Sequence, residues 1–183
     1  MNAMIDYVGS MITGGAVFIM MLSYYLNISA TAITQMFNST TQEDMTSISE
    51  VIEYDFRKAG YRVADSVAFA VIDSNRVALR GDYNNDGAMD TTYYWLSDEQ
   101  MPGSENASAK ILYRKSGNST VRLTNNGVTR FRVWYYGADG NSTADKKAIR
   151  FARVALNVEG RLSYEGERAG AYWERILKPQ NVR

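Results

Sequence analysis

The stretch YVGSMITGGAVFIMMLSYYL, residues 7–26, decides how the rest of the chain is organised. It contains no Asp, Glu, Lys or Arg, and the uncharged run continues to Gln42. A helix needs about 20 apolar residues to cross the hydrocarbon core of a bilayer. The sequence therefore predicts a membrane-spanning helix over about residues 5–30, to which everything that follows is attached.

A cleaved signal peptide is the alternative reading of this segment. Such a peptide has a positively charged start, an apolar core of about 7 to 15 residues and a small-residue cleavage site. In this chain the first basic residue is Arg57, and the apolar run is longer than such a core. A retained membrane helix is therefore favoured.

A helical pattern continues beyond the uncharged run. Apolar side chains recur at spacings of three and four residues, namely Met45, Ile48, Ile52, Phe56 and Ala59. Glu50, Glu53 and Arg57 fall largely off this stripe, which makes the segment amphipathic. Gly60 is expected to end the helix, because glycine is common just past a helix C-terminus. We predict an N-terminal helical domain over residues 1–60 whose second half packs on a folded domain.

The pattern after Gly60 changes to short alternating runs rich in Val, Tyr, Phe and Thr, separated by Gly, Asn, Asp and Ser. The expected strands are Val67–Asp73, Arg76–Arg80, Thr91–Leu96, Ile111–Lys115, Thr120–Leu123, Val128–Tyr136, Ala148–Val158 and Tyr172–Leu177. Their close spacing favours antiparallel pairing over crossover helices. The predicted fold is α+β, a long N-terminal helix packed on an antiparallel β-rich domain of residues 61–183.

Composition limits the available chemistry. The chain has no Cys and no His, which excludes disulfides, thiol chemistry, zinc sites built on these residues and nucleophiles activated by His. No Gly-rich phosphate loop or nucleophile motif is present either, so we expect no enzyme activity. The formal net charge is zero, and the basic excess after residue 56 is too diffuse to predict a nucleic-acid partner.

The chain resembles the type IV pilin family, including the pseudopilins of type II secretion. Four strings in the same order are similar to parts of the larger minor subunits: DFRKAGYR at 55–62, GDYNNDGAMD at 81–90, LTNNGVTRFRVWYYG at 123–137 and WERILKPQNVR at 173–183. The resemblance implies a minor pilin or pseudopilin that contacts membrane lipid and other pilin-like subunits through its N-terminal helix. It also implies a single-pass membrane protein whose C-terminal domain lies outside the cytoplasm, on the cell surface or in an extracellular filament after assembly.

The N-terminus departs from the family in part. A basic leader ending in Gly and a mature start like Phe-Thr-Leu-Ile-Glu are absent from MNAMIDYVGS. Counted from Asn2, however, Asp6 occupies the fifth position, where the family carries a glutamate. The resemblance implies that Asp6 acts in assembly by meeting the N-terminal amine of a neighbouring subunit, because a charge in a low-dielectric setting is costly unless it is paired. The alternative is an interfacial acid in the first helical turn, stabilised by the helix dipole.

The acidic loop has the pattern D-x-N-x-D-G-x-x-D, formed by Asp82, Asn84, Asp86 and Asp90 with Gly87 between them. It matches the first nine positions of a calcium loop of the EF-hand type, in which the Ala88 carbonyl would be a further ligand. Position twelve is Tyr93, so the bidentate Glu is missing. The alternative is a hairpin turn without metal, which Asn, Asp and Gly form readily. The cofactor prediction is therefore none or Ca²⁺.

Two further patterns concern the surface of the predicted domain and of the chain. In RFRVWYY, residues 130–136, alternation places Arg and Trp on one face, which gives either a stacking surface or an ordinary two-sided strand. Five Asn-x-Ser/Thr strings could accept glycans on an extracellular face, at Asn27, Asn38, Asn106, Asn118 and Asn141.

The alternative function is a membrane-anchored surface binding module or adhesin with a calcium loop that does not polymerise.

Overall fold

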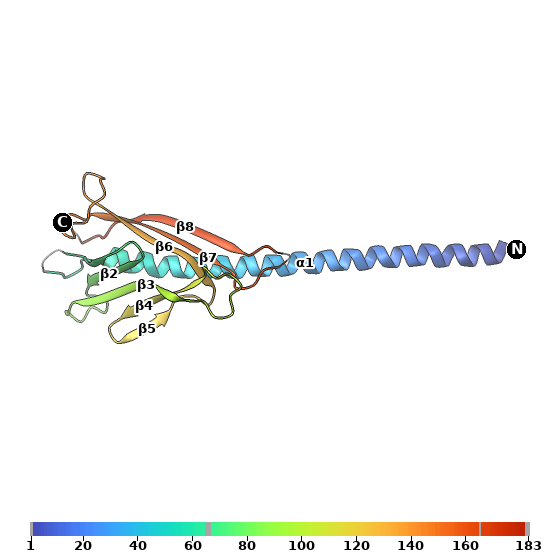
Figure 1. The fold of residues 1–183 in the computed structure, drawn as a ribbon, viewed down its shortest axis with the longest axis horizontal. Coiled ribbons are helices and arrows are strands. Elements are labelled where there is room, and N and C mark those ends of the chain that lie inside the picture. The colour runs from blue at the N-terminus through green and yellow to red at the C-terminus, as the bar shows by residue number, and fades with distance from the viewer. Residues whose placement is uncertain (1, 65–66, 165, 182–183) are drawn as a thin grey trace. The chain divides into compact units, whose positions relative to one another are not determined.

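The structure, a computed structural model, describes residues 2–64, 67–164 and 166–181. These residues form one helix, α1 (Asn2–Lys58), and eight strands (Figure 1). The strands are β1 (Phe69–Ile72), β2 (Arg76–Gly81), β3 (Asp90–Gln100), β4 (Lys110–Ser116), β5 (Ser119–Arg122), β6 (Gly127–Tyr136), β7 (Phe151–Glu159) and β8 (Gly170–Leu177). The predicted α+β fold, a long N-terminal helix with an antiparallel sheet, is confirmed. The last two residues of the string WERILKPQNVR lie outside the described residues.

The chain divides into two compact units, residues 1–37 and residues 38–183. The described part of the first unit is entirely helical, and its large apolar side chains face outward. Met4 is 78% exposed and Phe18 is 67% exposed, for example. By length and composition, the helix is apolar enough to cross a membrane. A signal sequence near the N-terminus can have the same length and composition.

Several Ser and Thr hydroxyl groups within this first unit are hydrogen-bonded to the helix itself. Ser10 donates to the carbonyl of Tyr7 at 2.9 Å, and Thr13 donates to that of Gly9 at 2.6 Å. Thr31 likewise donates to Asn27 at 2.9 Å. Such bonds satisfy the hydroxyl protons without water, which is what a hydrocarbon environment requires.

The second unit buries the amphipathic stripe of α1 in its core. Ile48, Ile52 and Phe56 are at most 1% exposed, and they form one cluster with buried side chains of the sheet such as Leu79 and Leu156. Burying one such side chain contributes about 1.5 to 3 kcal/mol relative to leaving it in water. The predicted packing of this half of the helix on the sheet is confirmed.

Gly60 follows the helix, as predicted. Its φ of 82° is in the left-handed region, which glycine adopts at little cost. Its backbone N–H donates to the carbonyl of Arg80 in β2 at 2.8 Å. The chain therefore leaves the helix and is bonded immediately to the sheet.

The sheet is antiparallel with strand order β1-β2-β3-β4-β6-β7-β8, and β5 pairs with β4 outside this path. Long registers join β2 to β3, β3 to β4, β6 to β7 and β7 to β8. By contrast, β4 and β6 share the single paired position Lys110 and Val128. A separate bond joins the β1–β2 turn to β6, because the carbonyl of Ser74 accepts from the N–H of Val133 at 2.8 Å.

Alternation along β6 agrees with the two-sided strand expected from RFRVWYY. Phe131 and Val133 are 3% and 2% exposed and belong to the core shared with α1, whereas Arg130 and Arg132 are exposed. The strand therefore has one face in the core and an opposite face that is cationic.

Candidate functional site

Asp6 lies in α1, one turn later than expected. The first turn of the helix contains no acidic residue, and the Asp6 side chain is exposed. Favourable interaction with the helix dipole is strongest in the first turn. The geometry therefore does not place Asp6 where the dipole alternative expected it, and its role in assembly stays a prediction.

Three glycines of the first unit have open space beside them. A Cβ built on Gly9, Gly14 or Gly15 would meet nothing within 4 Å. No packing inside the chain therefore requires a small residue at these positions. In membranes, small residues let a second helix approach closely. Because a helix turns about 100° per residue, however, the three glycines lie on different sides of α1 and do not form one surface.

The acidic loop joins β2 to β3 and is closed largely by its own hydrogen bonds. The Asn84 side chain accepts from the N–H of Asp86 at 3.0 Å and donates to the Asp86 carboxylate at 2.8 Å. Asp86 also accepts from the N–H of Ala88 at 2.7 Å, and Asp90 accepts from the N–H of Tyr83 at 3.2 Å. These are the contacts of a tight turn built from Asn, Asp and Gly.

Asp82 is the buried member of the loop, with a relative exposure of 0%. Its Oδ2 accepts from Arg62 Nη1 at 2.8 Å and from the N–H of Gly87 at 3.1 Å, whereas its Oδ1 is buried without a hydrogen-bond partner among the described residues. Burial acts to raise the pKa of Asp82, but the bond from Arg62 and the backbone bonds from Gly87 and Asn85 outweigh it and lower the pKa. Asp82 is therefore held as a carboxylate.

The loop brings the predicted oxygen ligands Asp82, Asn84, Asp86 and Asp90 into one turn, but it does not present them as an assembled metal site. Among the described residues, no group of three or more His, Cys, Asp or Glu is arranged to hold a metal ion. The Arg62 guanidinium pairs with Asp82 Oδ2 at 2.8 Å and would compete with a metal ion for that oxygen. Calcium binding would have to exchange some of these bonds, and it remains a prediction.

A second buried carboxylate joins α1 to the sheet. Asp55 is 1% exposed, and it accepts from Arg114 of β4 through both oxygens and from the hydroxyl of Tyr94 in β3. Burial acts to lower the pKa of Arg114, but the hydrogen bond and charge of Asp55 outweigh it and raise the pKa. Burial and the Asp55 charge also raise the pKa of Tyr94. Arg114 therefore stays charged and Tyr94 stays a hydroxyl donor, and their bonds to Asp55 help to orient the helix on the sheet.

Asp44, which also lies in α1, contacts the segment before β6. Asp44 Oδ2 accepts from the hydroxyl of Thr124 at 2.5 Å and from the side-chain amide of Asn126 at 3.0 Å. Thr124 Oγ1 in turn accepts from the N–H of Asn126 at 2.8 Å. Together with Asp55, this contact fixes α1 to the sheet at two positions eleven residues apart in sequence.

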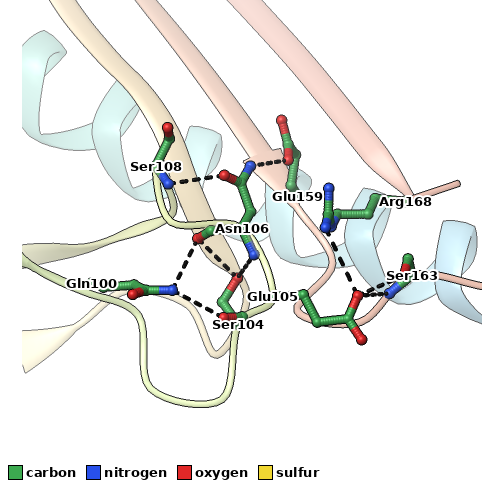
Figure 2. A network of polar contacts seen from close by, with 8 residues as sticks. All are labelled: Gln100, Ser104, Glu105, Asn106, Ser108, Glu159, Ser163 and Arg168. Carbon is green, nitrogen blue, oxygen red and sulfur yellow. Dashed lines mark hydrogen bonds and ion pairs between the residues drawn. The ribbon is translucent and has the colours of Figure 1, made fainter. Parts of the chain in front are cut away.

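Figure 2 shows a polar network that joins the β3–β4 loop to the β7–β8 hairpin. Glu105 accepts from the N–H of Ser163 at 3.0 Å and lies 3.8 Å from Arg168, while Asn106 donates to Glu159 at 2.8 Å. The bonds from Ser163 lower the pKa of Glu105. Gln100, Ser104 and Ser108 complete the network. It links the two halves of the sheet near the weak β4–β6 junction.

The five predicted glycan acceptors have different surroundings. Asn27 and Asn38 both lie in α1. Asn27 belongs to the first unit, and Asn38 is the first residue of the second. The side-chain amides of Asn106 and Asn141 donate to carboxylates at 2.8 Å. Asn118 is exposed in the turn between β4 and β5. A glycan at Asn118 would disturb the structure least.

No protein-family model, curated protein or solved structure matches the chain. The resemblance to pilins therefore rests on the helix and sheet architecture described above and on the quoted strings.

The role of Asp55 could have been found in the sequence. It lies three residues after Ile52 and four before Ala59, which places an acid on the apolar stripe of the helix. A buried carboxylate requires a partner. Its partner Arg114 lies 59 residues away and could not be chosen among the many basic residues of the domain.

Proposed function

We propose that this chain is a structural subunit of a filament like the type IV pilus or the type II secretion pseudopilus. It would act by assembly through α1, as a minor pilin or pseudopilin, and not as an enzyme. The observation that carries the proposal is the two-part character of α1 (Asn2–Lys58), which exposes apolar side chains before residue 38 and buries an amphipathic stripe after it.

The exposed apolar side chains support a lipid environment before assembly and neighbouring subunits after it. Large hydrophobic residues rarely form a wide exposed surface on a soluble protein without a partner. The self-satisfied hydroxyls of Ser10 and Thr13 and the open space at Gly14 suit close helix packing in that setting. Partners of the same pilin-like class would contact this segment, with Asp6 pairing with the amine of a neighbour.

This function implies that residues 61–183 lie outside the cytoplasm. Residues 5–30 of α1 would form the membrane-spanning part. The sheet domain would be displayed on the cell surface or in the filament. No nucleic-acid partner is part of the proposal.

Electron microscopy of surface material sheared from producing cells tests the proposal. Gold-labelled antibody to the sheet domain is expected along or at the ends of filaments. A label confined to membranes, with filaments unlabelled, would instead support the tethered adhesin. Residues on both sides of Asn38 are helical, whereas a flexible linker there would have favoured that adhesin.

A further inference from the structure

The outer face of β2, β3 and β4 carries a depression lined by aromatic and basic side chains that no contact described above uses. Its lining residues are Arg76, Tyr93, Trp95 and Lys115, and its volume is about 440 Å³. That volume lies within the range typical of small-ligand sites.

The sheet register explains why these residues share one face. Tyr94 pairs with Arg114, which reaches Asp55 of α1, so this row faces the helix. Adjacent residues of a strand point to opposite faces. Tyr93 with Lys115, and Arg76 with Trp95, therefore form two rows on the face away from α1.

One ring of the depression is held in place by a neighbouring ring. Trp95 stacks on Tyr113 with ring centroids 5.4 Å apart and an angle of 24° between the planes. The indole is thus supported from one side, which preorganises it for a ligand.

The charge of this surface has one sign. Arg76 and Lys115 are exposed, and neither forms an ion pair with a residue that the structure describes. Arg122 adds a further cation beside Tyr113. β2, β4 and β5 contain no acidic residue, and those of β3 lie at its ends. The complementary ligand is an anion with a flat apolar face.

We propose that this depression binds an acidic polysaccharide through a uronate unit. The C–H face of a sugar ring would lie on Trp95 or Tyr93, and its carboxylate would pair with Arg76 or Lys115. A guanidinium recognises a carboxylate through two parallel hydrogen bonds, which adds geometric selectivity.

The arrangement favours a sugar over single-stranded nucleic acid. A single-strand surface presents successive rings along a basic track. Here two rings border one depression, because Tyr113 is already stacked on Trp95. On the other half of the outer face, Trp134 is likewise covered, with Arg153 at 4.2 Å and Arg132 at 5.4 Å from its ring centroid.

Titration of the 183-residue chain in detergent with polygalacturonate, dextran and poly(dT) tests the proposal. Wild type should bind polygalacturonate and not dextran, and Lys115→Gln should weaken that binding about fivefold. Trp95→Ala should weaken it at least about tenfold. Lys147→Gln is the matched control, because it makes the same change at an exposed loop residue.

The proposal stands if Lys115→Gln weakens binding and Lys147→Gln does not. It is overturned if polygalacturonate does not bind, or if Lys115→Gln and the control bind equally. Binding of poly(dT) as tight as that of polygalacturonate would also overturn it and assign the surface to nucleic acid. Lys115 is exposed, so the test does not depend on whether Trp95→Ala folds.

Discussion

Arg114 of β4 holds Asp55 of α1 through two hydrogen bonds, Nε to Oδ2 at 2.7 Å and Nη2 to Oδ1 at 3.2 Å. The Asp55 side chain is 1% exposed and that of Arg114 is 23% exposed. This buried fork lies between the last turns of the helix and the middle of the sheet. Together with the Asp44 contact and the buried apolar stripe, it orients the helix on the sheet.

Arg114→Gln is expected to lower the free energy of unfolding of the sheet domain by about 2 to 3 kcal/mol, because it leaves a buried carboxylate without its cation. Thermal or urea unfolding in detergent measures this. Lys115→Gln, at the next residue on the opposite face, is the control and should change stability by less than about 0.5 kcal/mol.

The same pair should show energetic coupling. Asp55→Asn combined with Arg114→Gln should cost at least about 1 kcal/mol less than the sum of the two single changes, because the charges interact directly. Strictly additive costs would mean that the pair does not hold the helix.

Asp82 should make the sheet domain sensitive to acid. Its pKa is lowered in the folded state, so its contribution to stability is present above the unfolded value of about 3.9 and is lost as the pH falls through the folded pKa. The unfolding midpoint of wild type should therefore fall more between about pH 7 and pH 3 than that of Asp82→Asn. An equal fall in the two proteins would show that Asp82 does not cause the sensitivity.

Calcium at the acidic loop makes a separate prediction. Millimolar calcium should raise the unfolding midpoint of wild type and leave that of Asp86→Ala unchanged, with magnesium as the control ion. Arg62→Gln should bind calcium more tightly, because the guanidinium beside Asp82 no longer competes with the metal. If calcium does not change the unfolding midpoint of wild type, the loop is a hairpin turn that binds no calcium.

Local sequence pattern predicted most of the elements. Each of the eight expected strands corresponds to a strand of the structure, and Gly60 follows the helix as expected. The main difference is at β3, which continues through the polar residues Ser97–Gln100 past an irregularity in its pairing with β4. Alternation cannot predict an extension whose side chains are mostly exposed.

Local sequence pattern could not predict contacts between segments that are distant in the chain. The acid Asp55 could be recognised on the apolar stripe, but Arg114 as its partner depends on strand order and register. The loop motif likewise indicated oxygen ligands without indicating that Arg62, at a φ of 57°, would pair with Asp82. An arginine in the left-handed region is uncommon and has no sequence signature.

Asp6→Ala should reduce the amount of the protein in sheared filaments at least about tenfold relative to its amount in the membrane, because an unpaired amine would then be left in a low-dielectric setting. Asp6→Glu keeps the charge and should assemble. Quantitative immunoblots of the two fractions give the ratio. Normal assembly of Asp6→Ala would contradict the prediction that Asp6 pairs with the amine of a neighbouring subunit.

Cysteine cross-linking tests assembly through the first unit most directly, because the chain has no Cys of its own. Single variants Ser10→Cys, Gly14→Cys and Ser23→Cys, with Lys147→Cys as the control, would be oxidised in producing cells. We expect disulfide-linked dimers from positions on one side of α1, recovered with the sheared filaments, and none from the control. Dimers absent at every position of α1, or equally frequent at all positions and confined to the membrane, would contradict the filament account.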